Sequence, residues 1–302
     1  MKYAWIGKLK TVWPVTLMCQ VLGVSVSGFF EHRQRNRKAT PPVPTASGPR
    51  RVNHEALVAH IRAIHAEFKG EYGWPRVWKE LLARGVRVSK DRVQRLTKLH
   101  GILVRGKRKF VVTTDSKHSL PVAENPLARD FAPGAPDHVW TSDITCIATD
   151  EGWLYLAGVI DLFSRQVVGW SMQPHMQASL AMDALRMGWF RRHPKPGLIF
   201  HSDHGSQYCS HDFQAALQGY GMRSSMSRKG NYWDNAPTES LWGSLKVGRL
   251  YGKRSTTHRE AMDEAIDWLK FYNHRRLHST LSYVSSINFE ASWRAGQLNK
   301  AA

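Results

Sequence analysis

The sequence predicts an α/β fold: a mixed five-stranded sheet with helices on both faces, preceded by small all-α helix-turn-helix modules. Two observations predict it. From about residue 136 onward, β-branched and aromatic runs separated by turn residues alternate with amphipathic stretches, as in strands that alternate with helices. Before that point the apolar residues recur at helical spacing within strongly basic segments.

Positive charge is concentrated in the first third of the chain. The 302 residues include 43 Lys+Arg and 24 Asp+Glu, which gives a formal net charge of +19. Residues 1–110 hold 23 basic and 6 acidic side chains, whereas residues 111–302 hold 20 and 18. Such one-sided charge is typical of a polyanion-binding surface, and it favours a nucleic acid partner over a solubilising surface that mixes both signs.

The cysteines and the hydropathy pattern indicate where the protein works. Cys19, Cys146 and Cys209 are odd in number and far apart, which favours a reducing compartment over a disulfide framework. No run of about 18 apolar residues occurs, so the sequence predicts no membrane-spanning helix and no membrane partner. We therefore expect a cytoplasmic, nucleoid-associated protein.

Residues 1–35 predict a short helix-turn-helix-like segment. One helical stretch ends at Gly23, and Ser25 or Ser27 is placed to cap a second helix. Residues 36–50 contain four prolines and are predicted to form a Pro-rich linker.

Residues 51–112 predict a basic helix-turn-helix module that binds DNA. In its last helix Ser89 is the expected cap, and Val93, Leu96 and Leu99 are expected to face inward. A solvated amphipathic helix is the alternative interpretation. The basic residues on the outer face and just beyond the helix are predicted to contact DNA: Lys90, Arg92, Arg95, Lys98, Arg105, Lys107, Arg108 and Lys109.

Residues 136–295 predict the α/β domain, which follows a Pro-containing connector over residues 113–135. Strand-like runs at 139–148, 153–163 and 165–172 indicate an antiparallel three-strand meander. The remaining expected elements are a helix over 177–193, a short strand ending near 203, a helix over 211–221, a strand over 222–227, a helix opening near 234 and a helix over 258–276.

Three acidic residues stand out in this domain. Asp143 interrupts an apolar strand, Asp203 ends another, and Glu239 lies on the helix that opens near residue 234. Taken singly, each is equally well explained as an exposed acid or an acid favoured by a helix dipole. If the two strands are neighbours and the helix crosses them, the three carboxylates converge and suit Mg²⁺ or Mn²⁺. Lys246 falls on the same helix face as Glu239.

A second set of residues has a superficial zinc-ligand spacing: His201, His204, Cys209 and His211. The spacing fits no common zinc finger, and a strand leads directly into the segment. We therefore favour histidines that orient substrate or line a cleft, with Cys209 and His211 beginning a helix.

Four motifs carry a family resemblance: WTSDITCI, HSDHGSQY, GNYWDNAPTESLWGSLK and YNHRRLHSTLSY. With 35 residues between Asp203 and Glu239, and Lys246 seven residues after Glu239, the chain resembles the transposases of a large class of bacterial insertion sequences. Their catalytic core is of the retroviral-integrase (DDE) type. Ser282 and Ser286 depart from the family pattern, because they stand where a Gly and a Pro are expected.

The resemblance implies a ribonuclease-H-like core in which Asp143, Asp203 and Glu239 are catalytic and bind Mg²⁺ or Mn²⁺, with two ions per active site. It implies cleavage of DNA at the ends of the element and strand transfer of the 3′-hydroxyl into target DNA, with Lys246 in contact with that DNA. It also implies supporting residues that shape the loop, cap the helix or orient substrate: His201, Asn231, Asp234 and Asn235.

Partners follow from the same resemblance. They are the element ends and target DNA, a homo-oligomer on the paired ends, and the upstream reading-frame product, since such proteins are second-reading-frame products joined to it by frameshifting. Two alternatives remain open. A metal-dependent nuclease uses the same chemistry without joining, and an inactive DNA-binding regulator derived from a transposase uses only the basic modules.

Overall fold

The computed structural model describes residues 2–37, 52–104, 120–228 and 232–301, and the chain divides into two compact units between residues 51 and 52. The described part of the first unit contains the helices α1 (Lys2–Leu9), α2 (Val15–Val21) and α3 (Val26–Arg37). They pack around a small core of Ile6, Met18, Cys19 and Phe29. Gly23 lies between α2 and α3 with a φ of +61°, a conformation that glycine adopts without strain.

The second unit begins with the helices α4 (His54–Glu67), α5 (Trp74–Ala83) and α6 (Lys90–Leu99). Asn53 caps α4 by accepting hydrogen bonds from two backbone N–H groups, and Ser89 occupies the N-cap position of α6. The expectation that Leu99 faces inward is wrong. Its side chain is 68% exposed, because α6 ends there and no further turn packs over it. The three helices share a buried face formed by Leu57, Ile61, Ile64, Phe68, Val77, Leu81, Val93 and Leu96.

One mixed sheet of five strands forms the centre of the second unit, in the order β3-β2-β1-β4-β5. Its strands are β1 (Val139–Thr149), β2 (Gly152–Asp161), β3 (Val167–Gln173), β4 (Ile199–Ser202) and β5 (Arg223–Met226). The first three pair antiparallel, whereas β4 is parallel to β1 and β5 is parallel to β4. The predicted meander and mixed sheet are confirmed, and β1 is the central strand.

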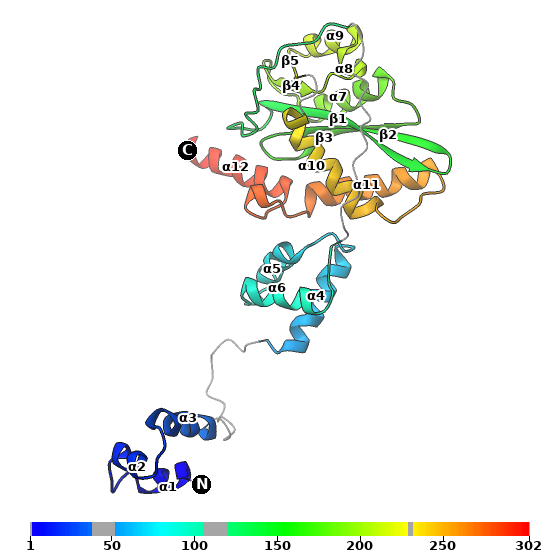
Figure 1. The fold of residues 1–302 in the computed structure, drawn as a ribbon. Coiled ribbons are helices and arrows are strands. Elements are labelled where there is room, and N and C mark those ends of the chain that lie inside the picture. The colour runs from blue at the N-terminus through cyan, green and yellow to red at the C-terminus, as the bar shows by residue number, and fades with distance from the viewer. Residues whose placement is uncertain (1, 38–51, 105–119, 229–231, 302) are drawn as a thin grey trace. The chain divides into compact units, whose positions relative to one another are not determined.

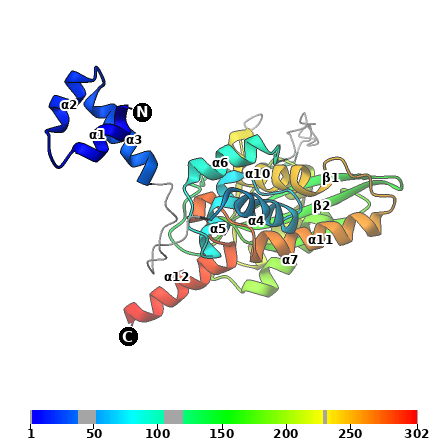
Figure 2. The same ribbon diagram turned by 90° about the horizontal axis from the view of Figure 1, so that it is seen from below.

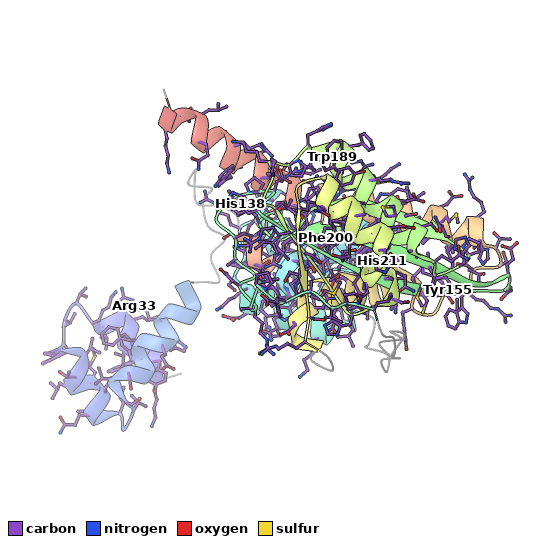
Figure 3. The ribbon with its side chains drawn as sticks, turned by 90° about the horizontal axis from the view of Figure 1, so that it is seen from above. Arg33, His138, Tyr155, Trp189, Phe200 and His211 are labelled. Atoms are coloured by element: carbon purple, nitrogen blue, oxygen red, sulfur yellow. The ribbon has the colours of Figure 1, made fainter. Side chains whose placement is uncertain are left out.

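Helices cover both faces of the sheet, as predicted (Figure 1). One face carries α7 (Ala178–Arg192), α8 (Ser206–Cys209) and α9 (His211–Gly219), and Phe200 of β4 lies in this layer, 1% exposed (Figure 3). The other face carries α10 (Ala236–Leu245), the π-helical segment η2 (Lys246–Leu250) and α11 (His258–His274). Along β2, Ala157 and Val159 pack on the α7 face, and Leu156 and Ile160 pack on the α10 face, as the strand pleat requires.

Short elements complete the domain: η1 (Tyr232–Asn235), η3 (Ser279–Leu281) and the last helix, α12 (Ser286–Ala301). Ser282, which departs from the glycine of the family pattern, follows η3 with a φ of 56°. The turn therefore takes the left-handed conformation that glycine would adopt more easily. None of the helices within the described residues is long and apolar enough to cross a membrane.

A buried ion pair joins the module of α4, α5 and α6 to the α10 face of the sheet domain. Glu71, between α4 and α5, pairs with Arg249 of η2 and accepts a 3.1 Å hydrogen bond from the indole N–H of Trp268. Both charged side chains are only 5% exposed. The hydroxyl of Tyr72 donates to the carbonyl of Arg275, 3.0 Å away. In Figure 2, which is seen from below, the three helices are drawn across α10 and α11, and in Figure 1 they lie below α11.

Glu71→Ala is expected to lower the free energy of unfolding by about 3 kcal/mol, because it removes one partner of a buried ion pair. Urea unfolding of the whole chain measures the loss. Glu80→Ala is the matched control, since it removes a carboxylate of α5 that pairs with the more exposed Arg84. That variant is expected to lose less than about 1 kcal/mol. Equal losses in the two variants would contradict a structural role for the junction.

Candidate active site

The sheet brings Asp143 and Asp203 to the same level. In the parallel pair of β1 and β4, Thr141 lies opposite His201. Asp143 and Asp203 follow this pair by two residues each, so the register places them beside each other at this edge of the sheet. Asp203 directly follows Ser202, the last residue of β4, at the strand end where open α/β sheets bind their ligands. The sequence-based hypothesis required the strands of Asp143 and Asp203 to be neighbours, and β1 and β4 are neighbours in the sheet.

The pKa of Asp143 is affected by the other two acids and by Lys246. Burial raises the pKa of the Asp143 carboxyl well above its usual range, and the negative charges of Asp203 and Glu239 raise it further. The backbone N–H of Ile144, which donates to Oδ1 over 2.8 Å, and the ammonium of Lys246 lower this pKa. Asp203, Glu239 and Lys246 are thus all within electrostatic reach of Asp143.

Helix α10 holds Glu239 near the sheet because it packs directly on β2. Gly158 lies opposite Asp143 in the ladder between β1 and β2. The indole of Trp242 lies over this glycine, so closely that a Cβ there would come within 2.6 Å of the ring. Trp242 follows Glu239 by less than one helical turn, so this contact sets the distance between the helix and the strand of Asp143. Burial raises the pKa of Glu239.

On the opposite face, Tyr208 and Ser142 form a buried contact that sequence analysis missed. Their hydroxyl oxygens are 2.9 Å apart. Burial raises the pKa of Tyr208 well above its usual range, and the charges of Asp143 and Asp203 act in the same direction, so the phenol remains protonated. Ser142 lies in the motif WTSDITCI and Tyr208 in the motif HSDHGSQY. No spacing pattern in the sequence connects a serine and a tyrosine to the site.

The segment before α10 is held by ion pairs. Asp234, whose side chain is 1% exposed, pairs with Arg228 at 3.0 Å and with Arg129 of the connector at 2.6 Å. Hydrogen bonds from Arg228 hold the pKa of this carboxyl far below its usual range, and those from Arg129 add to the effect. Asn235 occupies the N-cap position of α10 but makes no side-chain cap. Its Oδ1 instead accepts from the Thr141 hydroxyl at 3.1 Å.

The expected capping by Asp234 and Asn235 is therefore corrected, because their side-chain oxygens are engaged by arginine and hydroxyl groups.

His201 lies beneath the same segment, with Nε2 3.0 Å from the Asp234 carbonyl and Nδ1 2.9 Å from the Ser225 hydroxyl. It is 1% exposed, and burial lowers its pKa to about 4. His201 is thus a neutral residue under the loop and does not line an open cleft, which corrects that expectation.

Neither set of proposed metal ligands is preassembled. Cys209, which ends α8, directs its thiol to the sulfur of Met226 in the core, 3.6 Å away, so the zinc alternative loses a ligand. Among the described residues, no group of three His, Cys, Asp or Glu side chains is close enough to hold a metal ion. Asp143 and Asp203 nevertheless fit a hard cation, because their half-buried like charges disfavour one another without one.

The basic residues predicted to contact DNA differ in their surroundings. Lys90, Arg95 and Lys98 are exposed on α6. Arg92 is half-buried, and its guanidinium donates to the carbonyl of Val52 at 2.9 Å, so it helps to hold the start of α4. Five of the predicted residues lie outside the described part of the chain: Arg105, Lys107, Arg108, Lys109 and Asn231.

Family models match most of the second unit. The model described as "HTH-like domain" matches residues 53–110, and two models described as "Integrase core domain" match residues 133–232 and 220–285. The chain is 41% identical to the insertion element IS600 31 kDa protein of Shigella sonnei over 280 residues, which are 91% of this chain and 98% of that protein. It is 38% identical to the transposase InsF of insertion sequence IS3A of Escherichia coli over 291 residues, which are 96% of this chain and 98% of that protein.

Solved structures are similar at lower identity. The intasome of simian T-cell lymphotropic virus, in complex with a PP2A regulatory subunit, has a TM-score of 0.45 at 16% identity and covers 76% of this chain and 74% of its own. The HTLV-2 integrase catalytic core domain in complex with magnesium has a TM-score of 0.41 at 15% identity, covering 52% of this chain and 98% of its own.

Gly158→Ala is expected to lower the free energy of unfolding by about 1–3 kcal/mol, because the new methyl group meets the indole of Trp242. Trp242→Phe, which shortens the ring, should recover part of the loss in the double variant, so the two changes will not be additive. Gly243→Ala is the control, since nothing lies within 4 Å of the added Cβ. Strict additivity in a urea-unfolding cycle would show that this contact does not set the position of α10.

Proposed function

The chain belongs to the insertion-sequence transposases that carry an integrase core domain, and we propose that it cleaves the ends of its element and transfers each 3′-hydroxyl into target DNA. The proposal is supported by the strand register that brings Asp143 and Asp203 together, and by the charges of Asp203 and Glu239, which both raise the pKa of Asp143. Phosphoryl transfer to water and then to a 3′-hydroxyl needs positioned oxygens and charge neutralisation, and it needs no covalent link to the protein.

Asp143, Asp203 and Glu239 are the residues that would hold Mg²⁺ or Mn²⁺, as two ions in the working site. When bound, such ions neutralise charge on the phosphodiester and polarise the attacking and leaving oxygens. The like-charge repulsion at Asp143 supports this assignment, because a cation would turn an unfavourable burial into a favourable one. Related integrases include one described in complex with magnesium.

The surrounding residues position these acids. Trp242 on Gly158 fixes the approach of α10, and the ion pairs of Asp234 fix the segment that leads into it. Lys246 places an ammonium near Asp143, where it would contact a DNA phosphate beside the scissile bond. Tyr208 stays protonated beneath Asp143 and Asp203, so it adds no further negative charge to the site.

DNA recognition is assigned to the helical modules. The exposed residues Lys90, Arg95 and Lys98 of α6 would contact phosphates or base edges of the element ends. The paired ends would be held by more than one copy of the chain, and the upstream reading-frame product is a further proposed partner. The place of action would be the bacterial nucleoid, where the target DNA lies.

Labelled DNA that carries the element's own ends tests this function. With Mn²⁺ or Mg²⁺, and with the upstream product supplied, wild type should yield cleaved and joined products. EDTA should abolish both products, and Glu239→Gln should reduce both by about 10³-fold, since it removes several kcal/mol of transition-state stabilisation. Asp263→Asn, which removes an equal charge from the exposed face of α11, should react like wild type.

The outcomes separate the alternatives. Nicked DNA that is never joined would favour a metal-dependent nuclease. Binding without any chemistry, under each of these conditions, would favour a DNA-binding regulator. Full activity of Glu239→Gln would contradict the proposed ligand set.

A further inference from the structure

Two arginines meet where the module of α4, α5 and α6 joins the sheet domain, and no proposed role uses them. Arg76 lies in the first turn of α5, and Arg276 lies just after the end of α11. The Nε–H of Arg76 donates to the Leu277 carbonyl at 2.7 Å. A terminal N–H of Arg276 donates to the Ser244 hydroxyl of α10 at 2.9 Å. The pair is called the junction arginines below.

The junction arginines have no acidic partner among the described residues: neither has a carboxylate within 4.0 Å. Neighbouring arginines differ in this respect, because Arg249 pairs with Glu71 and Arg275 pairs with Glu67. A guanidinium carries five N–H donors, and the hydrogen bonds named above use one from each junction arginine. Both side chains are half-buried, so part of each remains accessible to a ligand.

The surroundings add positive charge and little negative charge. Burial and the nearby charge of Arg276 lower the pKa of Arg76 to about 10, so Arg76 remains charged at neutral pH. Glu71 also acts on Arg76 but is already paired with Arg249. His278, which faces both arginines, is neutral, because burial and these charges lower its pKa to about 3. The guanidinium of each junction arginine also lies over a tyrosine ring, Arg76 at 5.9 Å from the centroid of Tyr72 and Arg276 at 5.5 Å from that of Tyr272. A partly desolvated pair of guanidinium groups without a carboxylate partner is suited to a phosphate.

We propose that Arg76 and Arg276 bind the sugar–phosphate backbone of the DNA whose end lies in the active site. The proposal rests on the proposed function. Ser244, the contact of Arg276, follows Glu239 by five residues on α10, which is about 7.5 Å along the helix axis. Five residues also correspond to about 140° around the axis, so Arg276 contacts α10 on a different face from Glu239, roughly one and a half turns further along.

The two arginines come from different parts of the second unit, so a DNA strand bound by both would connect these two parts. Arg76 belongs to the helical module that would recognise the element end, and Arg276 belongs to the domain that would cut it. A strand held by both would be fixed in register between recognition and cleavage. The site contributes affinity without base specificity, because guanidinium contacts to phosphates carry no sequence information.

Fluorescence anisotropy of the full chain with duplex DNA carrying the element end tests the site, in EDTA so that no cleavage occurs. Affinity is measured over a range of salt concentrations. Arg76→Gln and Arg276→Gln should each reduce the slope of log affinity against log salt by about 0.9, the value for one lost phosphate contact. Arg276→Lys should retain the slope. Arg259→Gln, which removes an exposed charge from α11, should leave the slope and the affinity unchanged.

Thermal midpoints show whether each variant is folded. Unchanged slopes in Arg76→Gln and Arg276→Gln with wild-type midpoints would overturn the site. So would a loss of affinity in Arg259→Gln equal to theirs, because the effect would then follow net charge alone. If a Gln variant fails to fold, the salt slopes of Arg276→Glu and Arg276→Lys are compared instead, provided that the two variants have equal thermal midpoints. A lower slope in Arg276→Glu supports the site, and equal slopes overturn it. Reduced slopes together with an inactive wild type would retain the site and reject the catalytic proposal.

Discussion

The placement of the half-buried Asp143 beside Asp203 is the constraint on which the arrangement of the sheet domain depends. A carboxylate in the middle of a central strand is desolvated, and a second one level with it raises its pKa further. The fold offers little internal compensation: the N–H of Ile144, and Lys246 from a neighbouring helix. A bound divalent cation would offset the repulsion between these carboxylates. The same cation would supply the chemistry proposed for the site.

Helix α10 is secured at both ends, and each anchor comes from a distant segment. At its start, Asp234 is held by Arg129 of the connector. Just beyond its end, Arg249 is held by Glu71 of the helical module. Glu239 therefore lies on an element whose two ends are tied to the parts of the chain that precede the sheet domain.

Much of this arrangement was predictable from the sequence because it follows hydrophobic periodicity and motif spacing. The meander and the mixed sheet are of this kind, whereas the pairing of β1 with β4, which brings Asp143 and Asp203 together, was only a condition of the metal-site hypothesis. Contacts between distant polar residues were not predictable. The pairing of Glu71 with Arg249, and of Asp234 with Arg129, joins segments more than 100 residues apart, and no local pattern encodes such partners. The capping expected of Asn235 failed for the same reason, since Thr141 of β1 engages its side chain.

The thermal midpoint of the full chain, measured across a Mn²⁺ titration, tests the central claim most directly. A cation that binds only the folded acids must raise the midpoint of wild type as its concentration rises. Asp143→Asn keeps the shape and the acceptor of the side chain but removes its charge. It should therefore melt above wild type without metal and respond less to Mn²⁺. A variant that melts below wild type, with midpoints that Mn²⁺ leaves unchanged in both proteins, would contradict the account.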